Sequence, residues 1–350
     1  MPESFNCRRR RCNAVALWAL AGAVLSATAP ASRAAEAKVP EIKLSTAIAP
    51  SYPLGRAGER WAQLVNERAG GAFEVRQYSG ATLALRDPGR EFGALRDGLA
   101  ELSVGSALAW SAQFPPLAAY ATPWLTADAR EQEALVADRD LREKVFALME
   151  AAGVTGLAIA PLGEHVLATA KAAVEAPDDF AGLRVRVMPL RPMLEVFLSL
   201  GAQPQSMSFA EAQAAYVAGT LDGQDARPTT LVGTRAAASG QKFITRWGAF
   251  ADVMVFAVRK VAWDAWTEDR RELVRSAALQ AARESDALAR EEAALAQLTR
   301  EGVTIVRLSP PQRATLRDLA KSAIAAWTGA AGVELVEAAR SAVAAAALKQ

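Results

Sequence analysis

The sequence predicts an α/β protein built from two domains. Short β-rich runs alternate with longer helical runs over most of the chain, which is typical of sheets covered by helices on both faces. The chain has 350 residues, 51% hydrophobic and 22% charged, so it is long enough for two domains that share an interface. A long alanine-rich and charged run late in the sequence predicts a helix able to brace both domains.

The first unit follows a β-α-β order, which favours a mainly parallel sheet. Its helices are predicted at about residues 54–68, 90–99 and 128–152, the first of them closed by Gly70 and Gly71. The predicted strands are EIKLSTA (41–47), FEVRQY (73–78), ELSVGSA (101–107) and VTGLAIA (154–160).

The second unit has its own strand and helix order, with helices predicted at 191–200 and 209–218. Its strands are HVLATA (165–170), LRVRV (183–187), LDGQDA (221–226) and KFITRW (242–247), followed by VMVFAVR (253–259). The bracing helix, predicted at about 269–301, would extend about 45 Å. Because no Gly/Ser spacer is present, we expect strands to cross between the domains. The predicted domains are residues 35–160 plus about 248–285, and residues 161–247 plus about 286–350.

The first 34 residues have the pattern of a secretory signal. Arg8 to Arg11 form a basic region, Ala14 to Leu25 an apolar stretch, and Ser32 to Ala34 a small-x-small cleavage pattern. The apolar stretch is shorter than the ~20 residues that span a bilayer. The four arginines also permit a twin-arginine signal, although the flanking residues fit that pattern less well. We therefore expect a periplasmic mature protein.

Removal of this segment changes both the cysteine content and the charge. Cys7 and Cys12 lie inside it, so the mature chain would have no disulfide, thiol nucleophile or thiolate metal site. Residues 1–34 carry five arginines and one glutamate, so the formal charge falls from +2 to −2. With no basic excess, nucleic-acid binding is not expected.

The residues that catalysis requires are scarce. His165 is the single histidine, no G-x-S-x-G motif is present, and the S-x-x-K match at Ser239 to Lys242 lacks its companion motifs. Calcium loops and phosphate-binding glycine loops are also missing, so we expect no metal and no cofactor. The sequence therefore predicts a binding protein with a ligand between its domains, not an enzyme. A secreted hydrolase that depends on Ser239 is the alternative of a different class.

The stretch GLRVRVMP (182–189) places two arginines on one face of a predicted strand. Side chains alternate along a strand, so Arg184 and Arg186 point the same way. Open α/β sheets bind ligands at the carboxyl ends of their strands, and Arg186 lies nearer that end. A guanidinium offers paired donors to a carboxylate, so Arg186 is the candidate anchor for an organic acid and Arg184 is assigned to solvent.

The segment from PDDFAGLRVRVMP to LDGQDARP (177–228) resembles the second domain of the DctP-type substrate-binding proteins of TRAP transporters. The family pattern has Gly-Leu-Lys-x-Arg, then Leu-Gly-Ala-x-Pro, then Asp-Gly-Gln, in this order and spacing. Segments 98–125 and 253–278 are also similar to family segments, so the resemblance covers nearly all of the mature chain. It implies a periplasmic, two-domain receptor that closes on an organic acid and passes it to a TRAP permease.

The resemblance also implies roles for single residues. Arg186 matches the arginine that pairs with the ligand carboxylate, and Phe209 matches a position that packs against the ligand. His165 stands where the family often has a second arginine, and Ala226 replaces a ligand-facing asparagine. Arg227 is an extra residue, which supplies the missing charge or lies at the rim. His165 is alternatively a hydrogen-bonded interior histidine, and Phe209 a core aromatic.

Gln224 of the Asp-Gly-Gln segment and the aromatic residues Tyr52, Trp110 and Trp247 complete the candidate site. Each aromatic is alternatively part of the core. Together with Ala226 and His165 they predict a pocket with few fixed donors, and hence a less polar carboxylate, aromatic or branched aliphatic. We expect a monomer. A receptor that serves a sensor kinase or another importer has the same sequence features and remains an alternative.

Overall fold

The computed structural model describes residues 39–207 and 209–347. The secretory signal predicted for residues 1–34 lies outside these ranges. Within them, no helix combines the length and the apolar character needed to cross a bilayer.

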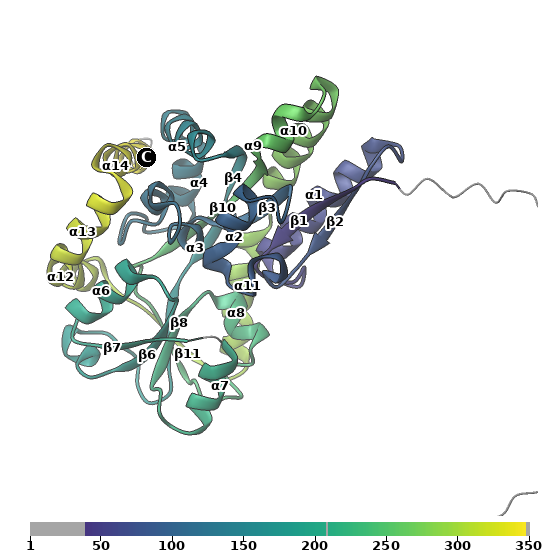
Figure 1. The fold of residues 1–350 in the computed structure, drawn as a ribbon. Coiled ribbons are helices and arrows are strands. Elements are labelled where there is room, and N and C mark those ends of the chain that lie inside the picture. Colours follow the sequence, from purple (N-terminus) through teal and green to yellow (C-terminus); the bar gives the residue numbers. More distant parts are fainter. Residues whose placement is uncertain (1–38, 208, 348–350) are drawn as a thin grey trace, which may run out of the picture. The chain divides into compact units, whose positions relative to one another are not determined.

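A five-stranded sheet, sheet A, has the order β2-β1-β3-β10-β4 (Figure 1). Strands β1, β2 and β3 run parallel to one another, whereas β10 is antiparallel to both β3 and β4. The strands are β1 (Glu41–Thr46), β2 (Glu74–Tyr78), β3 (Leu102–Ser106), β4 (Val154–Glu164) and β10 (Ala251–Arg259).

A six-stranded sheet, sheet B, has the order β11-β9-β5-β8-β6-β7. Parallel pairs form between β6 and β7, β6 and β8, and β9 and β11, whereas β5 is antiparallel to β8 and β9. The strands are β5 (Val166–Thr169), β6 (Arg184–Val187), β7 (Gln203–Ser206), β8 (Gly223–Ala226), β9 (Phe243–Arg246) and β11 (Thr304–Arg307).

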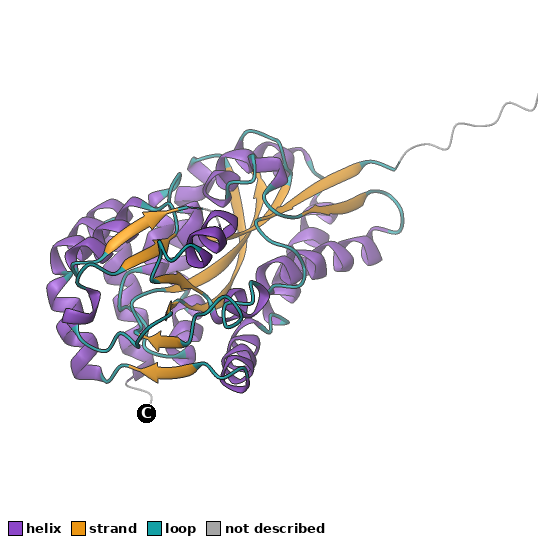
Figure 2. Cartoon of the chain, turned by 90° about the horizontal axis from the view of Figure 1, so that it is seen from below, coloured by secondary structure: helices purple, strands orange, loops and turns teal. Residues whose placement is uncertain are grey.

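Helices pack around the strands of both sheets (Figure 2). They are α1 (Pro53–Ala69), α2 (Glu91–Arg96), α3 (Ala107–Trp110), α4 (Ala129–Ala137), α5 (Arg139–Ala151), α6 (Arg191–Ser199), α7 (Phe209–Val217), α8 (Pro228–Gly233), α9 (Lys260–Ala265), α10 (Glu268–Arg283), α11 (Ala287–Arg300), α12 (Pro310–Leu319), α13 (Lys321–Ala331) and α14 (Val333–Ala347). Short 3₁₀ turns are η1 (Thr82–Ala84), η2 (Pro88–Arg90), η3 (Pro115–Ala121) and η4 (Pro177–Phe180).

The mainly parallel sheet predicted for the first unit is wrong in one respect, because both sheets are mixed. The reversal comes from the strands that cross between the sheets. β4 of sheet A is followed after one residue, His165, by β5 of sheet B, and β9 of sheet B leads through residues 247–250 into β10 of sheet A. The strand that follows each crossing is the reversed one. These strands are β10 in sheet A and β5 in sheet B, and each is antiparallel to both of its neighbours. Strand crossings without a flexible spacer were expected, and the structure has them.

Two helices predicted as single units are each divided in two. The stretch 128–152 breaks at Asp138, whose backbone is extended and whose side chain accepts from the amide of Leu141 at 2.8 Å. The stretch 269–301 breaks at residues 284–286, between α10 and α11. Ser and Asp at such positions offer local hydrogen bonds that compete with the helix. Helix α10 packs on α1 and β4 of sheet A, whereas α11 packs on α8 and β11 of sheet B and also on β4 of sheet A, so α11 contacts both sheets.

The C-terminal helices were not predicted. Helix α14 packs against α4 and α5, and α13 packs against η3 and α6 (Figure 1). Trp327 of α13 is buried, and its indole N–H donates to the carbonyl of Ala118 at 2.9 Å. The C-terminal segment therefore braces elements that surround both sheets. The assignment of residues to two domains remains a prediction.

Candidate functional site

A cavity of about 590 Å³, the central cavity, is lined by elements of both sheets. From the side of sheet A, it is lined by the β1–α1 connection, by residues 86–89, and by Ser106 with the start of α3. From the side of sheet B, it is lined by residues 186 and 188–190, by the end of β7, and by residues 225–227 with α8. His165, between β4 and β5, also lines it. Apolar atoms make up most of the exposed lining surface, although about half of the lining residues carry a polar side chain.

Arg186 lies in the wall of the cavity, near the carboxyl end of β6. It is 4% exposed, and two of its donors are held by backbone carbonyls, Nε by Met207 at 3.1 Å and Nη1 by Asp225 at 3.5 Å. Burial lowers the pKa of Arg186, and the nearby Asp225 opposes this effect. An arginine stays protonated even so, because its ordinary pKa lies far above neutral pH. The cavity therefore holds a buried cation with a fixed orientation.

Arg184, two residues earlier on the same strand, has a different environment. Its side chain is 34% exposed and forms a two-pronged ion pair with Asp222, with both N···O distances 2.8 Å. The hydrogen bonds from Arg184 lower the pKa of Asp222 to about 2. Arg184 does not line the central cavity. Strand geometry puts both arginines on one face, and position along the strand separates them.

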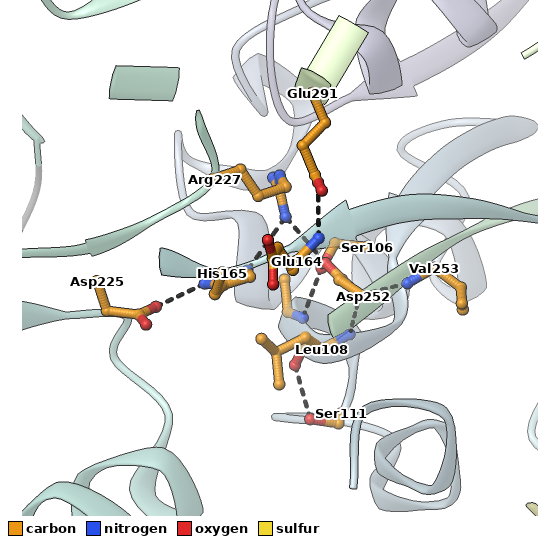
Figure 3. Close-up of polar contacts among 11 residues, drawn as sticks. Ser106, Leu108, Ser111, Glu164, His165, Asp225, Arg227, Asp252, Val253 and Glu291 are labelled. Atoms are coloured by element: carbon orange, nitrogen blue, oxygen red, sulfur yellow. Dashed lines mark hydrogen bonds and ion pairs between the residues drawn. The ribbon is translucent and has the colours of Figure 1, made fainter. Parts of the chain in front are cut away.

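His165 and Arg227 lie together in the cavity wall (Figure 3). His165 is 2% exposed; its Nδ1 lies 2.5 Å from Asp225 Oδ1, and its Nε2 lies 3.4 Å from Arg227 Nη1. A guanidinium can only donate, so Nε2 is the acceptor and Nδ1 carries the proton given to Asp225. His165 therefore positions Asp225 through Nδ1, and Arg227 is the second cation of the cavity wall.

Asp252 of β10 connects this group to sheet A. It is fully buried and accepts from Arg227 Nη1 at 3.0 Å and from Ser106 Oγ at 2.6 Å. The amides of Leu108 and Val253 complete its shell at 3.1 and 2.9 Å (Figure 3). A buried carboxylate with four donors is well satisfied. The chain of contacts from Asp225 to Asp252 thus joins β8 of sheet B to β10 of sheet A.

Tyr52, the residue that precedes α1, also lines the cavity. Its ring lies against Gly233 of α8, where a Cβ atom would collide with the phenol. Residues 86–89 also line the cavity, with Arg86 in a left-handed backbone conformation at φ 62°. Sequence reasoning missed this loop and Asp252. The only signal for Asp252 was a carboxylate beside an apolar strand, which suggests a buried charge with a partner.

Three further predicted site residues have other surroundings. Trp110 is fully buried and packs edge-on against Phe92, and Trp247 packs within the core against Phe180, Phe197 and Phe250. Gln224 is buried, and its amide donates to Gln241 at 2.8 Å. None of these three side chains lines the central cavity in the described structure.

Phe209 begins α7, but its side chain lies outside what the structure describes. Within the described ranges, no three acidic, histidine or cysteine side chains come together as a metal site.

The comparisons with known proteins match this geometry. Residues 44–329 match the model of the bacterial extracellular solute-binding proteins, family 7 (DctP). The chain belongs to this family. It is therefore a member of a family of solute receptors. A curated relative is the C4-dicarboxylate-binding periplasmic protein DctP of Rhodobacter capsulatus, 28% identical over 72% of this chain and 74% of the relative.

Two solved structures illustrate the fold. A TRAP periplasmic solute-binding protein of Ralstonia eutropha with bound (S)-2-acetolactate is 34% identical and has a TM-score of 0.82, covering 87% of this chain and 98% of that one. The sugar acid binding protein DctPAm of Advenella mimigardefordensis in complex with galactonate is 22% identical, with a TM-score of 0.79 over 88% and 99% of the two chains. At that identity it supports the fold alone: the α/β architecture with two domains and a cleft between them.

Proposed function

We propose that this protein binds a small carboxylate with an apolar body in the central cavity and delivers it to a TRAP-type permease. Residues 1–34 direct it to the periplasm, where it works as a monomer without catalytic activity. Residues 35–160 with about 248–285, and residues 161–247 with about 286–350, form the two domains that enclose the ligand.

The observation that carries this proposal is the position of Arg186. A guanidinium that is 4% exposed, lines a cavity and is held by two carbonyl oxygens is arranged to meet an anion from one direction. In such a site a carboxylate gains from the low local dielectric and from charge-assisted hydrogen bonds. Arg227, held by Asp252 and His165, supplies further donors to the same cavity.

The lining favours a ligand with an apolar body. Ile48, Leu54, Met188, Leu190 and Met207 line the cavity, and apolar atoms make up most of its exposed lining surface. A pocket of this kind would leave such hydroxyls unpaired. The (S)-2-acetolactate bound to the relative from Ralstonia eutropha is a short branched acid and supports the same choice.

A hydrolase based on Ser239 has no support in the site. The hydroxyl of Ser239 accepts from Gln213 and donates to the carbonyl of Arg235. Ser239 does not line the central cavity, and His165 is engaged by Asp225 and Arg227 there. Among the residues that the structure describes, no general base is shown in contact with this hydroxyl.

The test is a binding screen by thermal shift and calorimetry over monocarboxylates, dicarboxylates and sugar acids. We expect tight binding of a short monocarboxylate. We also expect at least a ~30-fold loss of affinity in Arg186→Ala, because truncation leaves the ligand charge buried without its partner. Arg184→Ala is the matched control, on the same strand and outside the cavity, and should bind as the wild type does. Unchanged affinity in Arg186→Ala, or tight binding of sugar acids or dicarboxylates alone, would refute the proposal.

A further inference from the structure

Asp225 is the acidic group of the central cavity that lies beside Arg186. The two residues belong to adjacent parallel strands, since Arg186 of β6 pairs in register with Gln224 of β8. Nη1 of Arg186 lies 3.5 Å from the carbonyl oxygen of Asp225. Both residues also line the central cavity, and the charge of Asp225 acts on Arg186, so one small ligand can meet both side chains.

The two carboxylate oxygens of Asp225 differ. Oδ1 accepts from His165 Nδ1 at 2.5 Å, whereas Oδ2 accepts no hydrogen bond from the part of the chain that the structure describes. The residue has no exposed surface and lines the cavity. A buried carboxylate oxygen without a donor is costly, because its hydration is lost and not replaced. The donor that completes this shell is absent from the described protein residues.

Resting on the proposed function, we propose that Asp225 Oδ2 accepts a hydrogen bond from a hydroxyl on the carbon next to the ligand carboxylate. The preferred ligands are then 2-hydroxy acids with a short apolar chain. A 2-oxo acid offers only an acceptor at this position, and an unsubstituted acid offers nothing. Either of these acids would leave Asp225 Oδ2 without a hydrogen-bond donor.

The neighbouring charges select a hydroxyl over an ammonium group. Arg186 contacts the backbone carbonyl of Asp225, and Arg227 contacts the histidine that binds the Asp225 carboxylate. An ammonium at this place would be repelled by both guanidinium groups, whereas a hydroxyl is neutral. Asp225 thus serves as a specificity residue for the hydroxyl, and His165 as a positioning residue that holds its other oxygen.

The test compares acids that share one carbon skeleton and differ in one group. The first set is 2-hydroxy-3-methylbutanoate, 3-methyl-2-oxobutanoate, 3-methylbutanoate and valine, and a second set uses the corresponding acids with a straight chain. We expect the hydroxy acid to bind at least ~10-fold more tightly than the other members of its set, the range for a buried acceptor left unpaired.

Asp225→Asn supplies the decisive variant. The asparagine can keep one oxygen for His165 and presents an amide donor in place of Oδ2, so the preference should move from the hydroxy acid towards the oxo acid. Asp222→Asn is the control, three residues earlier and paired with Arg184 outside the cavity. It should leave the order of affinities unchanged. Melting curves report whether each variant is folded.

The outcomes separate this inference from the proposed function. Equal binding of the hydroxy and unsubstituted acids, tightest binding of valine, or an unchanged order in a folded Asp225→Asn protein would overturn the role of Asp225 and leave the carboxylate receptor intact. The same holds if the screen finds a carboxylate ligand that lacks a hydroxyl next to the carboxylate. If no carboxylate binds at all, the proposed function itself fails.

Discussion

The molecule buries charged side chains in two nearby places, and the balance of charge differs between them. Beside the central cavity, the lining arginines Arg186 and Arg227 lie near two fully buried carboxylates, Asp225 and Asp252, so this group holds two cations and two carboxylates. In a second group, the crossing cluster of Glu164, Arg246, Glu291 and Glu292, three carboxylates surround one arginine. Both groups lie where the chain passes between the sheets.

The crossing cluster resolves its excess of negative charge by holding a proton. Glu291 of α11 is buried, and its Oε2 accepts from the amide of Glu164 at 2.7 Å. Burial, with the negative charge of Glu164 as the next contribution, raises the pKa of Glu291 to about 8. Gly163, at φ 103°, makes this contact possible, because a Cβ atom there would collide with the carboxylate. Similar buried residues thus prepare the central cavity for an anion and the crossing cluster for a proton.

Of the substitutions in these two groups, Asp252→Ala is expected to lower the free energy of unfolding most. The substitution removes the acceptor of four donors and leaves Arg227 buried without its counter-charge. We expect a loss of about 3–5 kcal/mol in the free energy of unfolding, measured by chemical denaturation. Asp252→Asn, which keeps the size and some acceptors, should lose less. A loss below about 1 kcal/mol in the alanine variant would show that Arg227 finds another partner.

A smaller, pH-dependent effect is expected for Glu291→Gln. Since the folded pKa of Glu291 lies above its ordinary value, its contribution to stability is complete below about pH 4.5 and is lost as the pH rises to about 8. The glutamine variant keeps an acceptor for the amide of Glu164 and cannot ionise. Its melting temperature relative to the wild type should therefore rise between about pH 5 and 8 and level off above that. A difference that stays constant with pH would mean that Glu291 is ionised throughout.

The smallest effect is expected for Glu292→Gln, one residue along the same helix. The side chain of Glu292 is 64% exposed and pairs with Arg246 Nη2 at 3.1 Å. An exposed ion pair of this kind contributes about 0–1 kcal/mol, and less at high salt. Denaturation curves at low and high salt should show this. A loss as large as that of Asp252→Ala would mean that the cluster acts as one unit.

The sequence was informative where local patterns decide the structure. Alternation along β6 placed Arg184 and Arg186 on one face, and their order along the strand separated the cavity arginine from the exposed one. The family resemblance pointed to His165 and Arg227, which the structure brings together. Most strands and helices were also predicted, because their periodicity is local.

Contacts between distant segments were not predictable. The pairing of Arg227 with Asp252 depends on the crossing of β9 into β10, and nothing in the residues around Asp252 names its partner. Trp110 and Trp247 were placed near the ligand because they lie close to predicted strand ends. Both fill the core, since only the packed structure shows which side of a strand end is open. The break at Asp138 coincides with a side-chain hydrogen bond to the amide of Leu141, which helical periodicity does not reveal.

His165 has one more contact, and it concerns motion. Its backbone N–H donates to the carbonyl of Phe250 at 2.8 Å, which ties together the two strands that cross between the sheets. Residues at a hinge move least when the two sides rotate. If the two crossings act as the hinge, rotation of one sheet against the other would hardly displace His165, Arg227 or Asp252. The residues at the crossings would then keep their contacts with one another while the cavity changes shape around them.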